Sequence, residues 1–190
     1  MTTNIMIVGV GGQGTLLASR ILGNVAIKMG YDVKVSEVHG MSQRGGSVVT
    51  YVKFGEKVSS PIIDKGEADI ILAFERLEAI RALPYLKKGG TIVVNDREIL
   101  PMPVITGATT YPNGIIDELK KVANVVSLDA LSLSVEAGSP KAVNVVLIGV
   151  LAKSLEIDKE TIVNVIKKTV PEKFLQLNLK AFELGYFYNC

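Results

Sequence analysis

The residues best suited to chemistry lie together in the segment 37–47, which reads E-V-H-G-M-S-Q-R-G-G-S. The chain's one histidine is here, with an arginine, two serines, an amide and three glycines. Glycines at positive φ expose backbone N–H groups, and a guanidinium offers a planar fork that fits phosphate or carboxylate. The segment therefore predicts an anion-binding or partner-facing loop made of His39, Gly40, Met41, Ser42, Gln43, Arg44, Gly45 and Gly46.

Two other interpretations of this loop stay open at this point. In an Ω-like structural loop, Arg44 would cap carbonyl groups and Met41 would fill a gap in the core. His39 could carry a proton or serve as a structural imidazole. Neither Ser42 nor Ser47 sits in a G-x-S-x-G elbow, and no His/Cys spacing typical of a metal site exists, so the chain alone does not look like a complete enzyme.

A glycine turn precedes the loop in the sequence G-V-G-G-Q-G, with glycines at Gly9, Gly11, Gly12 and Gly14. It follows an apolar strand-like run at 4–8 and opens a helical pattern at 15–28, so its amides and the helix dipole could hold a phosphate. Glu37 ends the next strand, where dinucleotide-binding proteins place a ribose-binding acid. No helix is predicted after Glu37, however, and the glycines would also serve a tight turn and close packing alone.

Glu75 and Asn95 follow two further buried strands. Because the carboxyl ends of parallel strands meet at one edge of a sheet, Glu37, Glu75, Asn95 and the glycine turn are expected to converge there. The alternative is that Glu75 and Asp96 only cap the starts of helices.

The elements that would position these residues alternate between strands and helices, which predicts an α/β fold: a three-layer, Rossmann-like, mostly parallel sheet with an antiparallel β-hairpin insertion and a helical C-terminus. The hydrophobic share of 48% and the length of 190 residues predict a single domain over 1–190. The hairpin is expected from 48–54 and 57–63, with Pro61 at an edge. Pro101 and Pro103 mark a loop. The expected strands are 4–8, 32–38, 69–74, 91–95 and 124–128, and the expected helices are 15–28, 76–86, 115–122, 142–155, 159–168 and 172–187.

Composition excludes several classes of function. The net charge is only +2, and the lysine pairs fall at expected helix ends, which argues against a nucleic-acid partner. One cysteine, Cys190, cannot form an internal disulfide, a thiolate zinc site or an iron–sulfur cluster. The longest apolar stretch, 143–152 broken by Asn144, is about half of the ~20 residues of a membrane span, so a cytoplasmic protein with no membrane contact is expected.

The chain resembles the gamma-type subunit or domain of 2-oxoacid:ferredoxin oxidoreductases, within them the small subunits that act on indolepyruvate. The motifs that carry the resemblance cover the first half of the chain in order and spacing: G-V-G-G-Q-G at 9–14, E-V-H-G-M-S-Q-R-G-G-S at 37–47, A-D-I-I-L-A-F-E at 68–75 and K-G-G-T-I-V-V-N at 88–95. The second half matches in outline, through an apolar helix with Asn144 and a final helix with Asn178 and Gly185.

The resemblance implies oxidation of an arylpyruvate with coenzyme A to an acyl-coenzyme A and carbon dioxide, with ferredoxin as electron acceptor. Thiamine diphosphate and the iron–sulfur clusters are then implied in a large partner subunit, and none of them in this chain. This chain would cover the active-site cleft, with the 40–47 loop facing the partner or coenzyme A and ferredoxin reached through the complex. In isolation the chain could form a homodimer.

Two further functions compete with this one. An autonomous NAD(P)-dependent enzyme would need a helix after Glu37 and a cofactor bound by the isolated chain. A stand-alone anion- or nucleotide-binding regulator would need a tight ligand and no large partner. The side chain of the 2-oxoacid is not determined by the sequence, because the pocket for it would lie largely on the partner.

Overall fold

The computed structural model describes residues 2–37, 46–155 and 157–188. Its centre is a six-stranded sheet in the order β2-β3-β1-β4-β5-β6, and β3 alone runs against the other five. The expected α/β fold with a mostly parallel sheet is confirmed. The strands are β1 (Thr2–Val10), β2 (Asp32–Glu37), β3 (Ser47–Gly55), β4 (Ala68–Ala73), β5 (Leu86–Asn95) and β6 (Asn124–Leu128).

The antiparallel insertion exists, but its pairing differs from the expected hairpin. β3 pairs along its whole length with β1, from Thr2 opposite Gly55 to Val10 opposite Ser47, and it pairs with β2 on its other side. Residues 57–63 form no strand. Both edges of β3 are already occupied, so no place is left for a partner strand at 57–63, and the expected hairpin was wrong.

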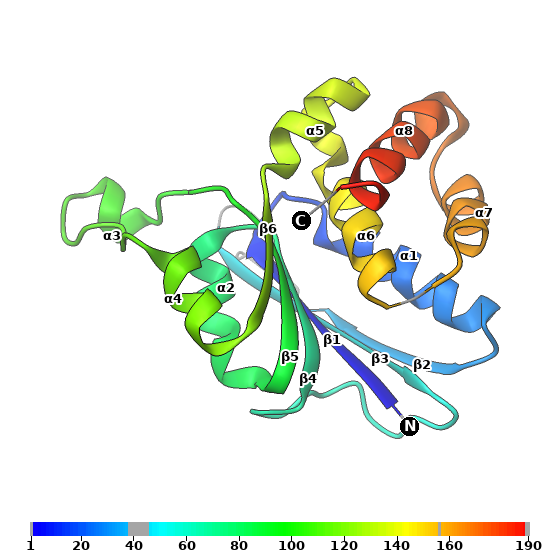
Figure 1. Ribbon diagram of the computed structural model, residues 1–190, viewed down its shortest axis with the longest axis horizontal. Coiled ribbons are helices and arrows are strands. Elements are labelled where there is room, and N and C mark those ends of the chain that lie inside the picture. Colours follow the sequence, from blue (N-terminus) through cyan, green and yellow to red (C-terminus); the bar gives the residue numbers. More distant parts are fainter. Residues whose placement is uncertain (1, 38–45, 156, 189–190) are drawn as a thin grey trace.

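Helices cover both faces of the sheet, as the three-layer expectation requires (Figure 1). Alternation along β1 divides the core, because Ile5 and Ile7 face one layer while Met6 and Val8 face the other. The smaller layer holds α2 (Arg76–Ala82) and α4 (Ile115–Val122). The larger layer holds α1 (Thr15–Lys28), α5 (Ala130–Ala137), α6 (Val143–Ser154), α7 (Lys159–Thr169) and α8 (Leu175–Tyr186).

Two helices were not expected from the sequence. One is α5, which Asp129 caps by accepting a hydrogen bond from Ser132 N at 3.0 Å and which Gly138 ends at a φ of +119°. The other is the short α3 (Met102–Ile105), where only a loop was predicted. Single 3₁₀ turns at Leu83–Tyr85, Pro140–Ala142 and Glu172–Phe174 precede β5, α6 and α8. No helix in the described part of the chain has the length and hydropathy to cross a membrane.

Two glycines let α6 and α8 cross at close range. A Cβ on Gly149 would lie 2.4 Å from Phe182 O, and a Cβ on Gly185 would lie 2.0 Å from Val146 O. Both distances are far below van der Waals contact, so the two backbones approach where neither carries a side chain. This crossing fixes the C-terminal helix on the layer that supports the candidate site.

Candidate functional site

The glycine turn between β1 and α1 is held by its own glutamine. Gln13 Oε1 accepts a hydrogen bond from Val10 N at 2.6 Å, and Gln13 Nε2 donates to Phe74 O at 3.0 Å. Gly12 and Gly14 have φ of +97° and +85°, which is the left-handed region that glycine tolerates. Gly11 N donates to Gly46 O at 2.8 Å, so the turn is also tied to the residue just before β3.

Asn144 supports the turn from the opposite side. It lies buried as the one polar residue of the apolar stretch 143–152 in α6, and its Nδ2 donates to Gly14 O at 3.2 Å. A Cβ on Gly14 would come within 2.7 Å of that nitrogen, so glycine is needed here for contact as well as for φ. One polar residue in an apolar helix was the sequence signal for this contact, because buried amides need partners.

Asn95 joins the turn to two more elements. This side chain is fully buried; its Nδ2 donates to Phe74 O at 3.2 Å and its Oδ1 accepts from Ala130 N at 3.1 Å. Phe74 O therefore receives both Gln13 and Asn95. This carbonyl, one residue beyond β4, is where the glycine turn and the end of β5 meet, and Asn95 links it to the start of α5.

Glu75 is a buried carboxylate with three donors. It is the N-cap of α2, where its Oε2 accepts from Glu78 N at 2.9 Å, as the capping interpretation expected. Its Oε1 accepts from Ile99 N at 3.1 Å and from the Tyr111 hydroxyl. Burial and then the hydrogen bond to Glu75 raise the pKa of Tyr111 well above its ordinary value, so this phenol remains a proton donor.

Asp96 does not cap a helix. Its Oδ1 accepts a hydrogen bond from Arg76 Nε at 2.5 Å on the surface. The capping interpretation of Asp96 was therefore wrong, because the chain leaves β5 in an extended segment and no helix begins at this residue.

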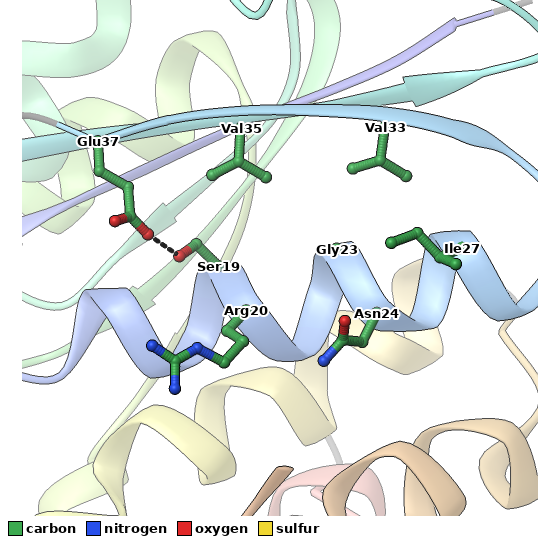
Figure 2. A pocket seen from close by; sticks show the side chains of 8 residues that line it. All are labelled: Ser19, Arg20, Gly23, Asn24, Ile27, Val33, Val35 and Glu37. Atoms are coloured by element: carbon green, nitrogen blue, oxygen red, sulfur yellow. Dashed lines mark hydrogen bonds between the residues drawn. The ribbon is translucent and has the colours of Figure 1, made fainter. Parts of the chain in front are cut away.

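Glu37 lies apart from the glycine turn. It accepts a hydrogen bond from Ser19 Oγ at 2.7 Å, and the two residues end a groove of about 560 Å³ between β2 and α1 (Figure 2). Because β3 is inserted between β2 and β1, Glu37 is two strand spacings, about 10 Å, from the strand that feeds the turn. In dinucleotide-binding sheets these strands are neighbours.

We therefore expect the isolated chain to bind NAD(H) and NADP(H) no more tightly than about millimolar. The turn is present, but the carboxylate that would hold the ribose is one strand too far away. Isothermal titration calorimetry with each dinucleotide measures this directly. Micromolar affinity for either one would contradict the expectation and favour the dehydrogenase interpretation.

A pocket of about 580 Å³ opens over the glycine turn. Its wall includes Gly11, Gly12 and Gly14 together with the side chains of Arg97 and Lys141. Neither cation has an acidic partner within the described ranges. Exposed amides at the start of α1 and two free cations provide what a phosphate or carboxylate group needs.

Arg97 and Lys141 were missed by the sequence analysis. Arg97 lies two residues beyond Asn95, so the same argument from strand ends could have found it. Lys141 lies in the turn before α6 and carried no comparable signal.

Most of the predicted loop, His39, Gly40, Met41, Ser42, Gln43, Arg44 and Gly45, lies outside the described residues. Its flanks are described, and both are tied to helices. On one side is the bond between Glu37 and Ser19 in α1. On the other, the Ser47 hydroxyl donates to the buried Glu78 in α2, which also accepts from Arg81 Nη1 at 2.6 Å.

The described residues do not form a metal site: no three His, Cys, Asp or Glu side chains among them are grouped to hold an ion. The backbone amides, Arg97 and Lys141 at the carboxyl edge are residue types suited to an anionic group.

Comparison with known proteins places the chain in a family. A model described as pyruvate ferredoxin/flavodoxin oxidoreductase matches residues 4–188. The chain is 47% identical to the indolepyruvate oxidoreductase subunit IorB of Thermococcus kodakarensis, covering 96% of this chain and 93% of that protein. It is 41% identical to the IorB subunit of Archaeoglobus fulgidus, covering 98% and 94%.

Two solved structures share the fold. The gamma subunit of a keto/oxoacid ferredoxin oxidoreductase from Geobacter sulfurreducens has a TM-score of 0.72 at 24% identity, covering 97% of this chain and 96% of that chain. A 2-oxoglutarate:ferredoxin oxidoreductase from Magnetococcus marinus has a TM-score of 0.74 at 18% identity, covering 97% of this chain and 30% of that chain. With the family model matched from residue 4 to residue 188, the chain belongs to the pyruvate ferredoxin/flavodoxin oxidoreductase family.

Proposed function

We propose that this chain is the small, non-catalytic subunit of a heteromeric 2-oxoacid:ferredoxin oxidoreductase, acting as one domain over residues 1–190 in the cytoplasm. The substrate class is the arylpyruvates, with indolepyruvate first among them. The observation that carries this proposal is the 47% identity to an indolepyruvate oxidoreductase subunit along almost the full length of both chains. The complex would convert the 2-oxoacid and coenzyme A into acyl-coenzyme A and carbon dioxide while reducing ferredoxin.

The residues of this chain support a division of tasks between it and the large partner subunit. Decarboxylation of a 2-oxoacid needs an electron sink, and electron transfer to ferredoxin needs clusters. One cysteine in the whole sequence cannot ligate a cluster, so the proposal assigns thiamine diphosphate and the iron–sulfur clusters to the large partner subunit. This chain would complete the active-site cleft and contact the anionic part of coenzyme A.

The contact surface we propose is the carboxyl edge of the sheet. Its support is the pocket over the glycine turn, where backbone amides and the cations Arg97 and Lys141 line one cavity. The segment 39–46 follows Glu37 and ends at Gly46, which accepts the hydrogen bond from Gly11 in that turn. This segment would be the loop that faces coenzyme A or the partner.

The test is reconstitution. The small chain and the large subunit are prepared separately and together, and reduction of a viologen dye is followed with indolepyruvate and coenzyme A. We expect activity only from the complex. Turnover by the isolated small chain would overturn the proposal, as would full activity of the large subunit without it.

Charge removal in the pocket tests the role in coenzyme A binding. In the reconstituted complex, Arg97→Ala combined with Lys141→Ala is expected to raise the KM for coenzyme A several-fold, because two cations facing an anion are lost. The kcat and the melting temperature should change little, since both side chains are exposed. Lys65→Ala removes an exposed cation elsewhere and serves as the matched control. An unchanged KM in the double variant would remove the pocket from the proposed site.

A further inference from the structure

A long and mostly exposed segment of the chain carries no charged side chain. Residues 99–116 contain no Asp, Glu, Lys or Arg, whereas charged residues make up 21% of the chain. At that rate 18 residues would hold about four charges. The part of this stretch from residue 99 to residue 111, here called the arm, contains α3 and leaves the body beyond the end of β5 (Figure 1).

The arm has its own internal structure. Thr106 N donates to Met102 O at 2.9 Å, and Pro103 O accepts from both Ala108 N at 2.9 Å and Thr109 N at 3.2 Å. Its helix α3 projects from the molecule and packs closely on no other element of the described chain (Figure 1). The tip is therefore ordered by local bonds instead of by contact with the core.

One buried carboxylate holds both ends of the arm. Glu75 accepts the backbone N–H of Ile99 at one end and the hydroxyl of Tyr111 at the other. Glu75 is 1% exposed and is itself fixed as the cap of α2. A segment clamped in this way loses little conformational entropy when it binds, which favours a role as a preformed contact.

The tip carries apolar side chains into solvent. Leu100, Met102 and Ile105 are 45%, 65% and 61% exposed and lie within six residues of one another. Neighbouring exposed apolar side chains on a projecting element are typical of a protein interface. Without a cation the arm has nothing to attract phosphate, so nucleic acid and an anionic membrane surface are poor occupants.

We infer that the arm is a docking element that inserts Leu100, Met102 and Ile105 into an uncharged, apolar surface of the large catalytic subunit. This inference rests on the proposed function. The base of the arm is continuous with the proposed site, because Arg97 and Ile99 line the pocket over the glycine turn. A partner that reaches that pocket therefore meets the arm as well. In the solved 2-oxoglutarate:ferredoxin oxidoreductase, the matching part is 30% of a longer polypeptide, so there this fold is covalently joined to a larger body.

The experiment compares two exposed apolar residues of the arm, Met102 and Ile105, with an equally exposed isoleucine outside it. Ile105 and Ile27 are both 61% exposed, but Ile27 lies on α1, on the other face of the sheet. Full-length chains carrying Met102→Glu with Ile105→Glu, or Ile27→Glu alone, are titrated onto the large subunit by biolayer interferometry. We expect the arm variant to weaken binding at least ten-fold and the Ile27 variant to bind like the wild type. The melting temperatures of the isolated chains should all agree.

Each other outcome has a definite meaning. If the wild-type chain does not bind the large subunit, the proposed function fails and the inference with it. If the wild type binds and the arm variant binds equally well, the inference alone is overturned. If the isolated wild type is a dimer that the arm variant converts to a monomer while heteromer formation is unchanged, the arm contacts a second copy of this chain, and the inference is likewise overturned.

Discussion

Replacing Gly185 with alanine is expected to lower the free energy of unfolding by about 3 kcal/mol or more. The new Cβ would lie 2.0 Å from Val146 O and 2.8 Å from the Val146 carbonyl carbon. Both atoms belong to the backbone of α6, so relief requires the two helices to move apart. Urea unfolding followed by circular dichroism measures the loss, which is a large part of the roughly 5–15 kcal/mol that a domain commonly has.

A second helical glycine provides the control. A Cβ on Gly23 in α1 would meet Val35 Cγ2 at 3.6 Å, which is ordinary contact, and its φ is not in the left-handed region. Gly23→Ala is expected to leave stability unchanged or to raise it by up to about 1 kcal/mol through helix propensity. Equal stability of the Gly185 and Gly23 variants would show that α6 and α8 do not cross at the distance described.

The second large effect is expected at Glu75. Glu75→Ala should cost about 3 kcal/mol, because three donors lose a buried acceptor and each such loss costs roughly 1–3 kcal/mol, not fully additively. It should also release the arm, since Ile99 N and the Tyr111 hydroxyl share that carboxylate. Limited proteolysis, with cleavage sites located by mass spectrometry, should show faster cutting between residues 99 and 111.

Asp96→Ala is the matched carboxylate control. Asp96 is exposed and pairs with Arg76 at the surface, so its removal is expected to change stability by only ~0 to 1 kcal/mol. The arm should then be cut at the wild-type rate. If the Glu75 variant were as stable and as resistant as the Asp96 variant, the carboxylate would not be the clamp of the arm.

Local sequence patterns predicted most elements of the fold, but they did not predict how the strands pair across the sheet. Alternation marks 48–54 as a strand, but it does not reveal that β1 and β2 both pair with it. The hairpin expectation assigned its partner to the next segment along the chain, whereas the register with β1 joins residues up to 53 positions apart. The helix α5 was missed because its sequence, A-L-S-L-S-V-E-A, does not divide clearly into a polar and an apolar helix face. The signals that mark it are its two caps, Asp129 and Gly138.

The sequence predicted the site residues that follow the ends of strands. It did not predict the contacts that are made by backbone atoms. Glu75 and Asn95 were placed at one edge because both follow parallel strands. The structure joins Asn95 to the turn through Phe74 O, whereas the Glu75 side chain accepts from Ile99 N and the Tyr111 hydroxyl. The acceptor that Gln13 and Asn95 share is a backbone carbonyl oxygen, and a residue's type does not indicate such a contact. Lys141 reaches the pocket from a turn that is distant in sequence. The distance between Glu37 and the glycine turn depends on the order of the strands, which local patterns do not give.

The way β3 enters the sheet has a consequence for how the molecule opens. A parallel strand in the position of β3 would need a crossover connection, usually a helix, but β3 pairs antiparallel with β2 and needs none. On the face of the sheet that Met6 and Val8 share, the irregular segment with the buried Ile63 lies where such a helix would otherwise pack. At β2 and β3, α1 therefore covers one face of the sheet, and no helix packs closely on the opposite face within the described residues. Free energies of local opening should therefore fall from β1 outward to β2, and amide hydrogens of β2 should exchange with solvent long before those of β1 and β4.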